Sequence, residues 1–305
     1  MHTTMKKFLM TFACAVMTVV GMQAQLLYKI SGNGLDKPSY IIGTYHLAPV
    51  MFADSISGLQ KALAASDQVY GELDMQNLTS PENLQKMQAA MMLPEGTTLS
   101  TLLSADEMKR LNAALKELLG MDMTNGLIAQ QLGGLSPIAL QTQLSMLIYL
   151  KKHSGFNPQD TFDGYFQKVA LQQGKPVGGL ETVDFQVSVL YQGYTLKRQK
   201  ELLMCMVDNL EYENQVSERV VEAFFKQDLM GIKAIMDEKQ NNSCDYTPEE
   251  ENRLIYDRNA NWVKLMPEIM SAKPTFFAVG AGHLPGDKGV LQLLQSAGYT
   301  VEAVK

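Results

Sequence analysis

Short apolar runs alternate along this chain with longer stretches whose apolar residues recur at helical spacing. Residues 26–30 and 39–43 are typical of strands, and the Gly- and Asn-rich segment 31–38 between them favours a hairpin. Apolar positions three and four residues apart over 54–65 then predict a helix, and residues 68–73 are again strand-like. The N-terminal part therefore predicts a unit of strand, loop, helix and strand.

The same order of elements returns at the C-terminal end. It predicts a strand over 275–279, a helix over 288–296 and a final strand over 299–304. Two units of this kind, far apart in sequence, predict one sheet with a duplicated core made of two pseudo-equivalent βαβ halves. The fold class expected is α+β.

A long and mostly helical segment separates the two units. Ser104 begins a helix over 104–119 with the capping-box partner Glu107, and Pro137 lies in the first turn of a helix over 136–152. Helices are also expected over 160–173, 195–240 and 248–271, and a short strand over 176–181. These helices are expected to form a large insert that caps the sheet.

The first residues form a basic start followed by the apolar run Phe8–Met22 and a small residue, Ala24. This pattern predicts a secretory signal peptide over 1–24, because an uncleaved anchor needs about 20 apolar residues. No low-complexity linker follows, so residues 25–305 are expected to form a single domain. Its core is expected to come from 25–75, 175–190 and 274–305. The protein is then secreted or periplasmic, and the signal segment is its one expected contact with a membrane.

Charge and cysteine content narrow the functional classes. The net charge of the 305 residues is −6 and the basic residues are scattered, which argues against binding to nucleic acid. An exported chain keeps Cys205 and Cys244, which can pair in an oxidising compartment, although the sequence leaves that pairing open. There is no Cys-x-x-Cys spacing for zinc. The oligomeric state is also left open.

The two strand-like units carry the same short motif. Gly43-Thr44-Tyr45-His46-Leu47 and Gly280-Ala281-Gly282-His283-Leu284 each place a histidine three residues after a glycine that closes an apolar strand. Side chains just beyond the carboxyl ends of strands face the crevice in which open sheets bind ligands. The motifs therefore predict two imidazoles at a functional site, against the alternative that each is a hydrogen-bonded structural residue.

Two carboxylates also follow strand-like runs. Glu72 ends the run 68–73, with the alternative that it is a solvent-facing edge residue, and Glu181 follows a Gly-Gly-Leu sequence, with helix capping as its alternative. Arg258 lies four residues before Trp262 on a predicted helix, where it can reach a carboxylate or an oxyanion, or form a surface salt bridge. The candidate catalytic residues are His46, Glu72, Glu181, Arg258 and His283.

Two imidazoles and carboxylates are a donor set suited to a divalent transition metal. Such an ion activates water and polarises a carbonyl, as amide hydrolysis requires. The chain has neither a Gly-x-Ser-x-Gly elbow nor a phosphate-binding glycine fingerprint, which argues against a serine hydrolase and a nucleotide enzyme. A metal-dependent hydrolase is therefore the first hypothesis.

Several of these segments together resemble the TraB/PrgY/GumN family, which is related to the Tiki proteases and more remotely to erythromycin esterases and ChaN-like haem-binding proteins. The resemblance covers nearly the whole chain after residue 25. It is carried by Leu27–Ile30, Tyr40–His46, Glu72–Asp74, Gly179–Thr182 with Gln186, Arg258–Asn259 with Trp262, and Val279–Gly286.

This resemblance implies a Tiki/TraB-like fold and peptidase activity dependent on manganese or cobalt, and the donor set of the residues adds zinc as a further candidate. Carried over to this chain, it implies His46, Glu72 and His283 as metal or catalytic residues, with Glu181 and Arg258 as further site residues. The expected partner is a peptide or protein substrate. The alternative is a non-catalytic protein that sequesters a peptide or a haem-like ligand in the same crevice, and a purely structural envelope protein is a third reading.

Overall fold

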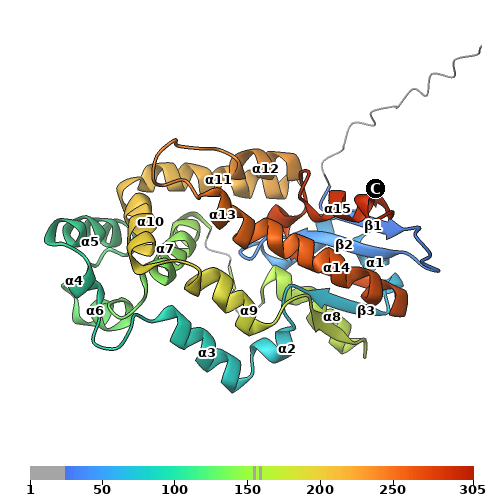
Figure 1. Cartoon of the computed structure of the whole chain (residues 1–305), viewed down its shortest axis with the longest axis horizontal. Helices are drawn as coiled ribbons and strands as arrows, with labels where there is room; N and C mark the ends of the chain where they lie inside the picture. Colours follow the sequence, from blue (N-terminus) through green and yellow to red (C-terminus); the bar gives the residue numbers. More distant parts are fainter. Residues whose placement is uncertain (1–24, 154–155, 158–159) are drawn as a thin grey trace, which may run out of the picture.

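The computed structural model describes residues 25–153, 156–157 and 160–305. The predicted signal peptide, residues 1–24, lies outside the described residues. Among the described residues, no helix has the length and apolar character needed to cross a membrane. Figure 1 shows a sheet at one end of the molecule and a lobe of helices at the other.

Six strands form one mixed sheet in the order β4-β3-β5-β2-β1-β6. The sheet and the helical content confirm a fold that mixes helices and strands, and the hairpin predicted for β1 and β2 is present. Because β1 pairs antiparallel with both β2 and β6, it is the one strand of this sheet that runs against the others. The strands are β1 (Leu27–Ser31), β2 (Ser39–Thr44), β3 (Gln68–Gly71), β4 (Val177–Gly179), β5 (Thr275–Gly280) and β6 (Thr300–Ala303).

The α-helices match most of the expected ranges. Ser104 and Glu107 form the predicted reciprocal capping box, and Pro137 opens its helix as expected. The helices are α1 (Leu59–Ala65), α2 (Met75–Leu78), α3 (Pro81–Met91), α4 (Leu99–Leu102), α5 (Ala105–Leu119), α6 (Gly126–Leu132), α7 (Pro137–Lys152), α8 (Phe162–Gln172), α9 (Val183–Val187), α10 (Leu196–Asp208), α11 (Leu210–Phe225), α12 (Leu229–Met236), α13 (Pro248–Glu251), α14 (Asp257–Ala272) and α15 (Val290–Ser296).

Four shorter helical turns complete the chain. They are the 3₁₀ turns η1 (Val50–Ser55) and η4 (Ala281–His283) and the π-helical turns η2 (Ser188–Gln192) and η3 (Asn252–Tyr256). The π turn η3 joins α13 to α14, so the helix predicted over 248–271 is one run with a wide turn inside it. Wide turns of this kind recur near functional sites.

The two parallel strands β2 and β5 are neighbours at the centre of the sheet, and Thr44 pairs with Gly280 at their carboxyl ends. From β2 the chain crosses β5 to reach β3, whereas from β5 it crosses β2 and β1 to reach β6. The two connections therefore leave this strand pair in opposite directions. Such a topological switch point opens a crevice at the carboxyl ends of its strands. Both expected units are present, while their origin by duplication stays a prediction.

Helices cover both faces of the sheet. On one face, α8 contacts β3 and β5, and Gln60 of α1 hydrogen-bonds Tyr165 of α8. Phe166 of α8 stacks on Phe276 of β5 with ring centroids 5.2 Å apart. On the other face, α14 packs on α15 and buries Trp262 completely. Burial of these large side chains supplies most of the favourable free energy that holds the layers together.

The helical lobe has a hydrophobic core of its own. That core draws on α4, α5, α7 and α10 and is separate from the cluster that surrounds the sheet. In Figure 1 these helices lie apart from the sheet, while α9, α11, α12 and α13 lie between the two. The lobe corresponds to the predicted helical insert, and its status within a single domain of residues 25–305 stays a prediction.

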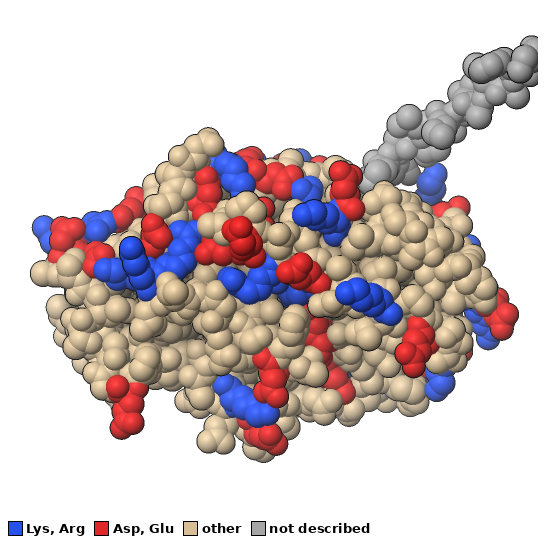
Figure 2. Space-filling view, viewed as in Figure 1, with Lys and Arg blue, Asp and Glu red and all other residues tan. Residues whose placement is uncertain are grey.

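Opposite charges are interspersed on the face of the molecule seen in Figure 2, with no concentrated basic patch on that face. One disulfide joins Cys205 of α10 to Cys244 in the loop after α12, with Cα atoms 5.5 Å apart. The sequence had left that pairing open.

Candidate active site

The predicted site residues come from the carboxyl ends of four parallel strands. His46 follows β2, Glu72 follows β3, Glu181 follows β4 and His283 follows β5. The β3–β4 ladder continues past the strands, because the Glu181 N–H donates to the Glu72 carbonyl at 2.9 Å. This pairing fixes the two carboxylates side by side at the switch point.

Arg258 ties three of these side chains together from α14, on the opposite side of the crevice. Its Nε and Nη2 donate to the two carboxylate oxygens of Glu181 at 2.7 and 2.9 Å. Nη2 also donates to Glu72 Oε2 at 2.7 Å, and Nη1 donates to His283 Nε2 at 3.1 Å. The Arg258 side chain is only 5% exposed. The surface salt bridge considered for Arg258 is therefore wrong.

Glu181 is more deeply buried still. Its side chain is 3% exposed, and Trp262 Nε1 donates to its Oε1 at 2.9 Å in addition to the two bonds from Arg258. The hydroxyl of Thr182, rather than Glu181, accepts from the Phe185 N–H at the start of α9. The capping role considered for Glu181 is therefore wrong, and this carboxylate is a fixed negative charge behind Arg258.

Glu72 faces the crevice from the β3 end, with its side chain 15% exposed. Its Oε1 accepts from the Gly280 N–H at 2.8 Å, and Oε2 accepts from Gln186 at 3.1 Å. A Cβ at position 280 would lie 3.2 Å from Oε1, so glycine at the end of β5 lets the carboxylate reach the backbone. Glu72 is therefore part of the site rather than a solvent-facing edge residue.

The electrostatics keep Glu72 ionised. Burial by itself raises the pKa of Glu72, but the positive charges around it, from His283 when protonated and from Arg258, together with the Gly280 N–H, lower the pKa to about 2. A carboxylate with so low a pKa holds a proton poorly at neutral pH. It is better suited to binding a positive charge than to acting as a general base.

His283 is buried and neutral. Burial, together with the positive charge of Arg258, lowers its pKa to about 4 against the opposing effect of Glu72. Arg258 can only donate, so Nε2 accepts and Nδ1 carries the proton, which it donates to Asn259 Oδ1 at 2.7 Å. Asn259 is held by its own bonds to the carbonyls of His283 and Lys288. The network thereby fixes one tautomer of His283.

His46 differs from His283 in both its exposure and its protonation. Its side chain is 73% exposed, and Nδ1 lies 2.8 Å from Asp163 Oδ2. The negative charge of Asp163 and its hydrogen bond to the ring raise the pKa of His46 to about 9. Asp163, in the first turn of α8, also accepts a short hydrogen bond from the Thr44 hydroxyl. At neutral pH the His46 imidazole is therefore protonated.

His46 and Glu72 line two adjoining pockets. One, of about 180 Å³, extends toward Leu73 and Leu78, and the other, of about 320 Å³, contains Arg258 and His283. The shared lining residues place these two pockets side by side at the switch point, and together they are called the groove. The structure thus brings Glu72, Glu181, Arg258 and His283 into one bonded network and places His46 on the rim of the same groove.

Asp163 was missed by sequence reasoning, because an acid in the first turn of a helix is typical of dipole stabilisation. Gln167 was also missed: it hydrogen-bonds the Leu73 carbonyl at 2.7 Å and the Met75 N–H at 2.9 Å, and so holds the segment after Glu72. Neither residue belongs to a motif that the sequence displays. His153, to which no function was assigned, lies away from the groove and pairs with Glu218 at 3.2 Å.

The metal-ligand assignment of His46, Glu72 and His283 stays a prediction. Within the described part of the chain, no cluster of three or more His, Cys, Asp or Glu side chains is arranged to hold a metal ion. The donor types nevertheless suit a borderline divalent ion, and Glu72 Oε1 lies 3.9 Å from His283 Nε2. Because Nε2 has one lone pair, a metal ion on it and the hydrogen bond from Arg258 exclude each other.

A mixed sheet with a charged His/Glu/Arg site at its switch point defines the structural class. A profile of the TraB/PrgY/gumN family matches residues 26–303, and the chain belongs to that family. No solved structure matches the chain.

Named relatives of the chain are metalloproteases. Metalloprotease TIKI2 of Danio rerio is 26% identical, over 87% of this chain and 58% of its own length. Metalloprotease TIKI1 of Homo sapiens is 27% identical, over 88% of this chain and 60% of its own length. The Metalloprotease TIKI homolog of Nematostella vectensis is 23% identical, over 88% of this chain and 65% of its own length. The chain therefore spans about three fifths of the length of these relatives and shares a family relationship with metalloproteases.

Proposed function

We propose that this protein is a metal-dependent hydrolase that cleaves peptide bonds in a peptide or protein substrate outside the cytoplasm. The observation that carries the proposal is the convergence of Glu72, His283 and Arg258 at a topological switch point, on a groove that His46 also lines. The metalloprotease names of the relatives support the reaction class.

The proposed metal ligands are His46, Glu72 and His283, and the proposed ion is manganese, cobalt or zinc. Such an ion would supply an activated water and polarise the substrate carbonyl when bound. The three residues offer imidazole nitrogen and carboxylate oxygen, the donors that these ions accept. Binding would require His46 to give up the proton that Asp163 stabilises and Arg258 to release His283 Nε2.

The remaining residues prepare the groove for hydrolysis. Asp163 and Thr44 orient the His46 ring, and Asn259 orients the His283 ring. Arg258 provides a permanent positive charge beside the reacting carbonyl, because two carboxylates and a backbone carbonyl hold its guanidinium in place.

The groove is shaped for an extended chain with apolar side chains. Leu73, Met75 and Leu78 line one end, while Tyr45, Leu190, Phe224 and Ile232 line the other. Apolar walls with a few fixed polar groups are typical of sites that bind organic ligands. A peptide lying across the switch point would place its backbone beside His46 and Glu72.

One observation favours a second candidate function. His283 Nε2 already accepts from Arg258, and such a closed network suits a site that captures a ligand without cutting it. The candidate is a non-catalytic protein that sequesters a peptide or a haem-like ligand in the same groove.

We also propose that the protein is exported after cleavage of the signal peptide at residues 1–24, to the periplasm or beyond the cell. The Cys205–Cys244 disulfide supports this location, because disulfides persist in oxidising compartments.

A cleavage screen tests the function. Purified protein is incubated with a peptide library, with chelator or with added manganese, cobalt or zinc, and products are read by mass spectrometry. We expect metal-dependent cleavage by the wild type and none by His46→Ala or His283→Ala, while His153→Ala, outside the groove, stays active. Elemental analysis is expected to find about one ion per chain. Binding of peptides without cleavage under any condition would overturn the hydrolase proposal in favour of sequestration.

A further inference from the structure

A cavity of about 410 Å³ lies beside the groove and has no part in the proposed chemistry. It is lined by residues of α7, α10, α11, the loop after α12 and the turn η3. Met236 and Ile255 line both this cavity and the pocket that holds Arg258 and His283. The cavity therefore adjoins the groove at these two side chains.

Most charged groups around the cavity are already paired. Asp237 pairs with Lys233, Glu238 with Arg219 and Glu251 with Lys239. Asp245 accepts from two backbone N–H groups, those of Gln240 and Asn241, at 2.7 Å each. These four carboxylates have partners and need no ligand.

Glu213 is the exception. This side chain of α11 lines the cavity, is half-buried, and makes no hydrogen bond or ion pair with any described residue. Burial raises the pKa of Glu213 without any opposing partner. Partial removal of an unpaired carboxylate from water is unfavourable, and a basic ligand group would supply the missing partner.

A second acceptor in the wall also lacks a partner. The Oε1 atom of Gln141, on α7, is buried and receives no hydrogen bond. Three tyrosines, Tyr212, Tyr246 and Tyr256, line the same space. Aromatic faces around a carboxylate and a free amide oxygen bind ammonium and guanidinium groups, which donate several hydrogen bonds and are attracted to aromatic rings.

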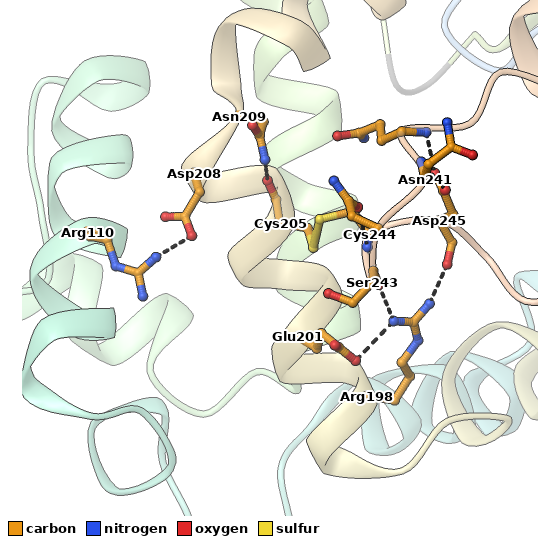
Figure 3. Close-up of a disulfide and its surroundings, with 12 residues drawn as sticks. Arg110, Arg198, Glu201, Cys205, Asp208, Asn209, Asn241, Ser243, Cys244 and Asp245 are labelled. Carbon is orange, nitrogen blue, oxygen red and sulfur yellow. Dashed lines mark hydrogen bonds and ion pairs between the residues drawn. A yellow bond between two sulfur atoms is a disulfide. The ribbon is translucent and has the colours of Figure 1, made fainter.

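The wall of the cavity is held rigidly. Figure 3 shows Cys205 of α10 bonded to Cys244 of the loop, with Arg198 reaching the same loop. Arg198 donates to the carbonyls of Ser243 and Asp245 at 2.5 and 2.8 Å, and to Glu250 at 2.9 Å. A loop fixed in this way does not have to be ordered when a ligand enters, so little entropy is lost on binding.

We propose that this cavity is a specificity subsite that receives a basic side chain, lysine or arginine, with Glu213 as its ion-pair partner and Gln141 Oε1 as a further acceptor. The role of the subsite in substrate choice rests on the proposed peptidase function. Binding of a basic side chain in the cavity does not depend on that function, because the cavity exists independently of catalysis.

The binding test uses two small probes, N-acetyl-lysine amide and its neutral counterpart N-acetyl-norleucine amide, followed by ligand-observed NMR on the full chain. We expect the lysine probe to bind at least fivefold more tightly than the norleucine probe, and Glu213→Gln to remove that difference. Glu211→Gln is the matched control, because Glu211 lies on the same helix, is exposed and bonds Gln215. Its preference for lysine should match that of the wild type.

Two results of the binding test would overturn the proposal. These are equal binding of the two probes and a lysine preference that survives Glu213→Gln. Folding is checked by thermal denaturation, in which Glu213→Gln is expected to melt at or above the wild-type temperature because it removes a half-buried carboxylate that has no partner among the described residues. A chain that prefers lysine but cuts no peptide would retain this subsite while losing the proposed hydrolase function.

Discussion

The two histidines of the look-alike motifs lie in opposite surroundings, although both follow the central strands of one sheet. His283 belongs to a buried wall in which Arg258, Glu181 and Asn259 fix every polar atom. His46 belongs to an exposed rim and has Asp163 as its one side-chain partner among the described residues. Strand position therefore determines where each imidazole lies, while burial and the sign of the neighbouring charge determine its protonation.

Arg258→Met should have the largest effect, because it leaves two buried carboxylates without their shared cation. Removal of one partner from a buried ion pair costs about 3 to 5 kcal/mol in the free energy of unfolding. Urea denaturation measures the change, and adding Glu181→Gln in the same chain should recover part of it. An unfolding free energy equal to that of the wild type would show that the wall does not depend on Arg258.

The substitutions His283→Ala and His46→Ala test whether the buried and the exposed histidine differ in their contribution to stability. We expect His283→Ala to lower the unfolding free energy by about 2 to 3 kcal/mol, because Asn259 Oδ1 and an N–H of Arg258 lose their partner. His46→Ala removes an exposed ion pair and should cost less than about 1 kcal/mol. Both should abolish cleavage. Equal losses of stability would erase the distinction between wall and rim.

The pH dependence of stability follows from the burial of His283 beside Arg258. The folded chain holds the pKa of His283 at about 4, whereas an unfolded histidine titrates near about 6.5. The stabilising contribution is therefore complete above about 6.5 and is lost as the pH falls toward 4, by about 1 to 3 kcal/mol. Denaturation at pH 7 and pH 4.5 measures this loss. In His283→Gln the difference between the two pH values should be smaller, and an unchanged difference would contradict the buried neutral state.

Asp163→Asn should have the smallest effect on stability and a clear effect on pH dependence. The pKa of His46 is raised to about 9 mainly by Asp163, so its removal should return that pKa toward the usual range. The stability contributed by the His46–Asp163 pair is complete below about pH 6.5 and is lost as the pH rises through about 9. In the variant that alkaline loss should disappear, and the acidic limb of any cleavage profile, below which His46 is protonated and cannot bind the ion, should move to lower pH. A profile identical to that of the wild type would show that Asp163 does not act on His46.

Much of this architecture is predictable from local signals in the sequence. The hairpin of β1 and β2, the capped helix α5 and the strand ends that carry Glu72 and Glu181 follow from periodicity and turn residues. Strand order is not a local property, however. The sequence alone does not reveal that β5 lies between β2 and β3, and this insertion is what creates the switch point.

The site was predictable in its members but not in its connections. Four strand-end residues and Arg258 were identified, yet the burial of Glu181 and the tautomer of His283 depend on contacts with α14 that no spacing encodes. Asp163 gave no signal, because its role arises only where the first turn of α8 meets the end of β2. Tertiary packing therefore decides which polar residues become a site.

The most direct test of the division between wall and rim is an NMR titration of the histidine rings, assigned with His46→Ala and His283→Ala. We predict one ring with a pKa well above about 6.5, absent in His46→Ala, and one well below it, absent in His283→Ala. Titration of both rings together at about 6.5 would overturn this assignment, because it would show that the fold does not distinguish the two imidazoles.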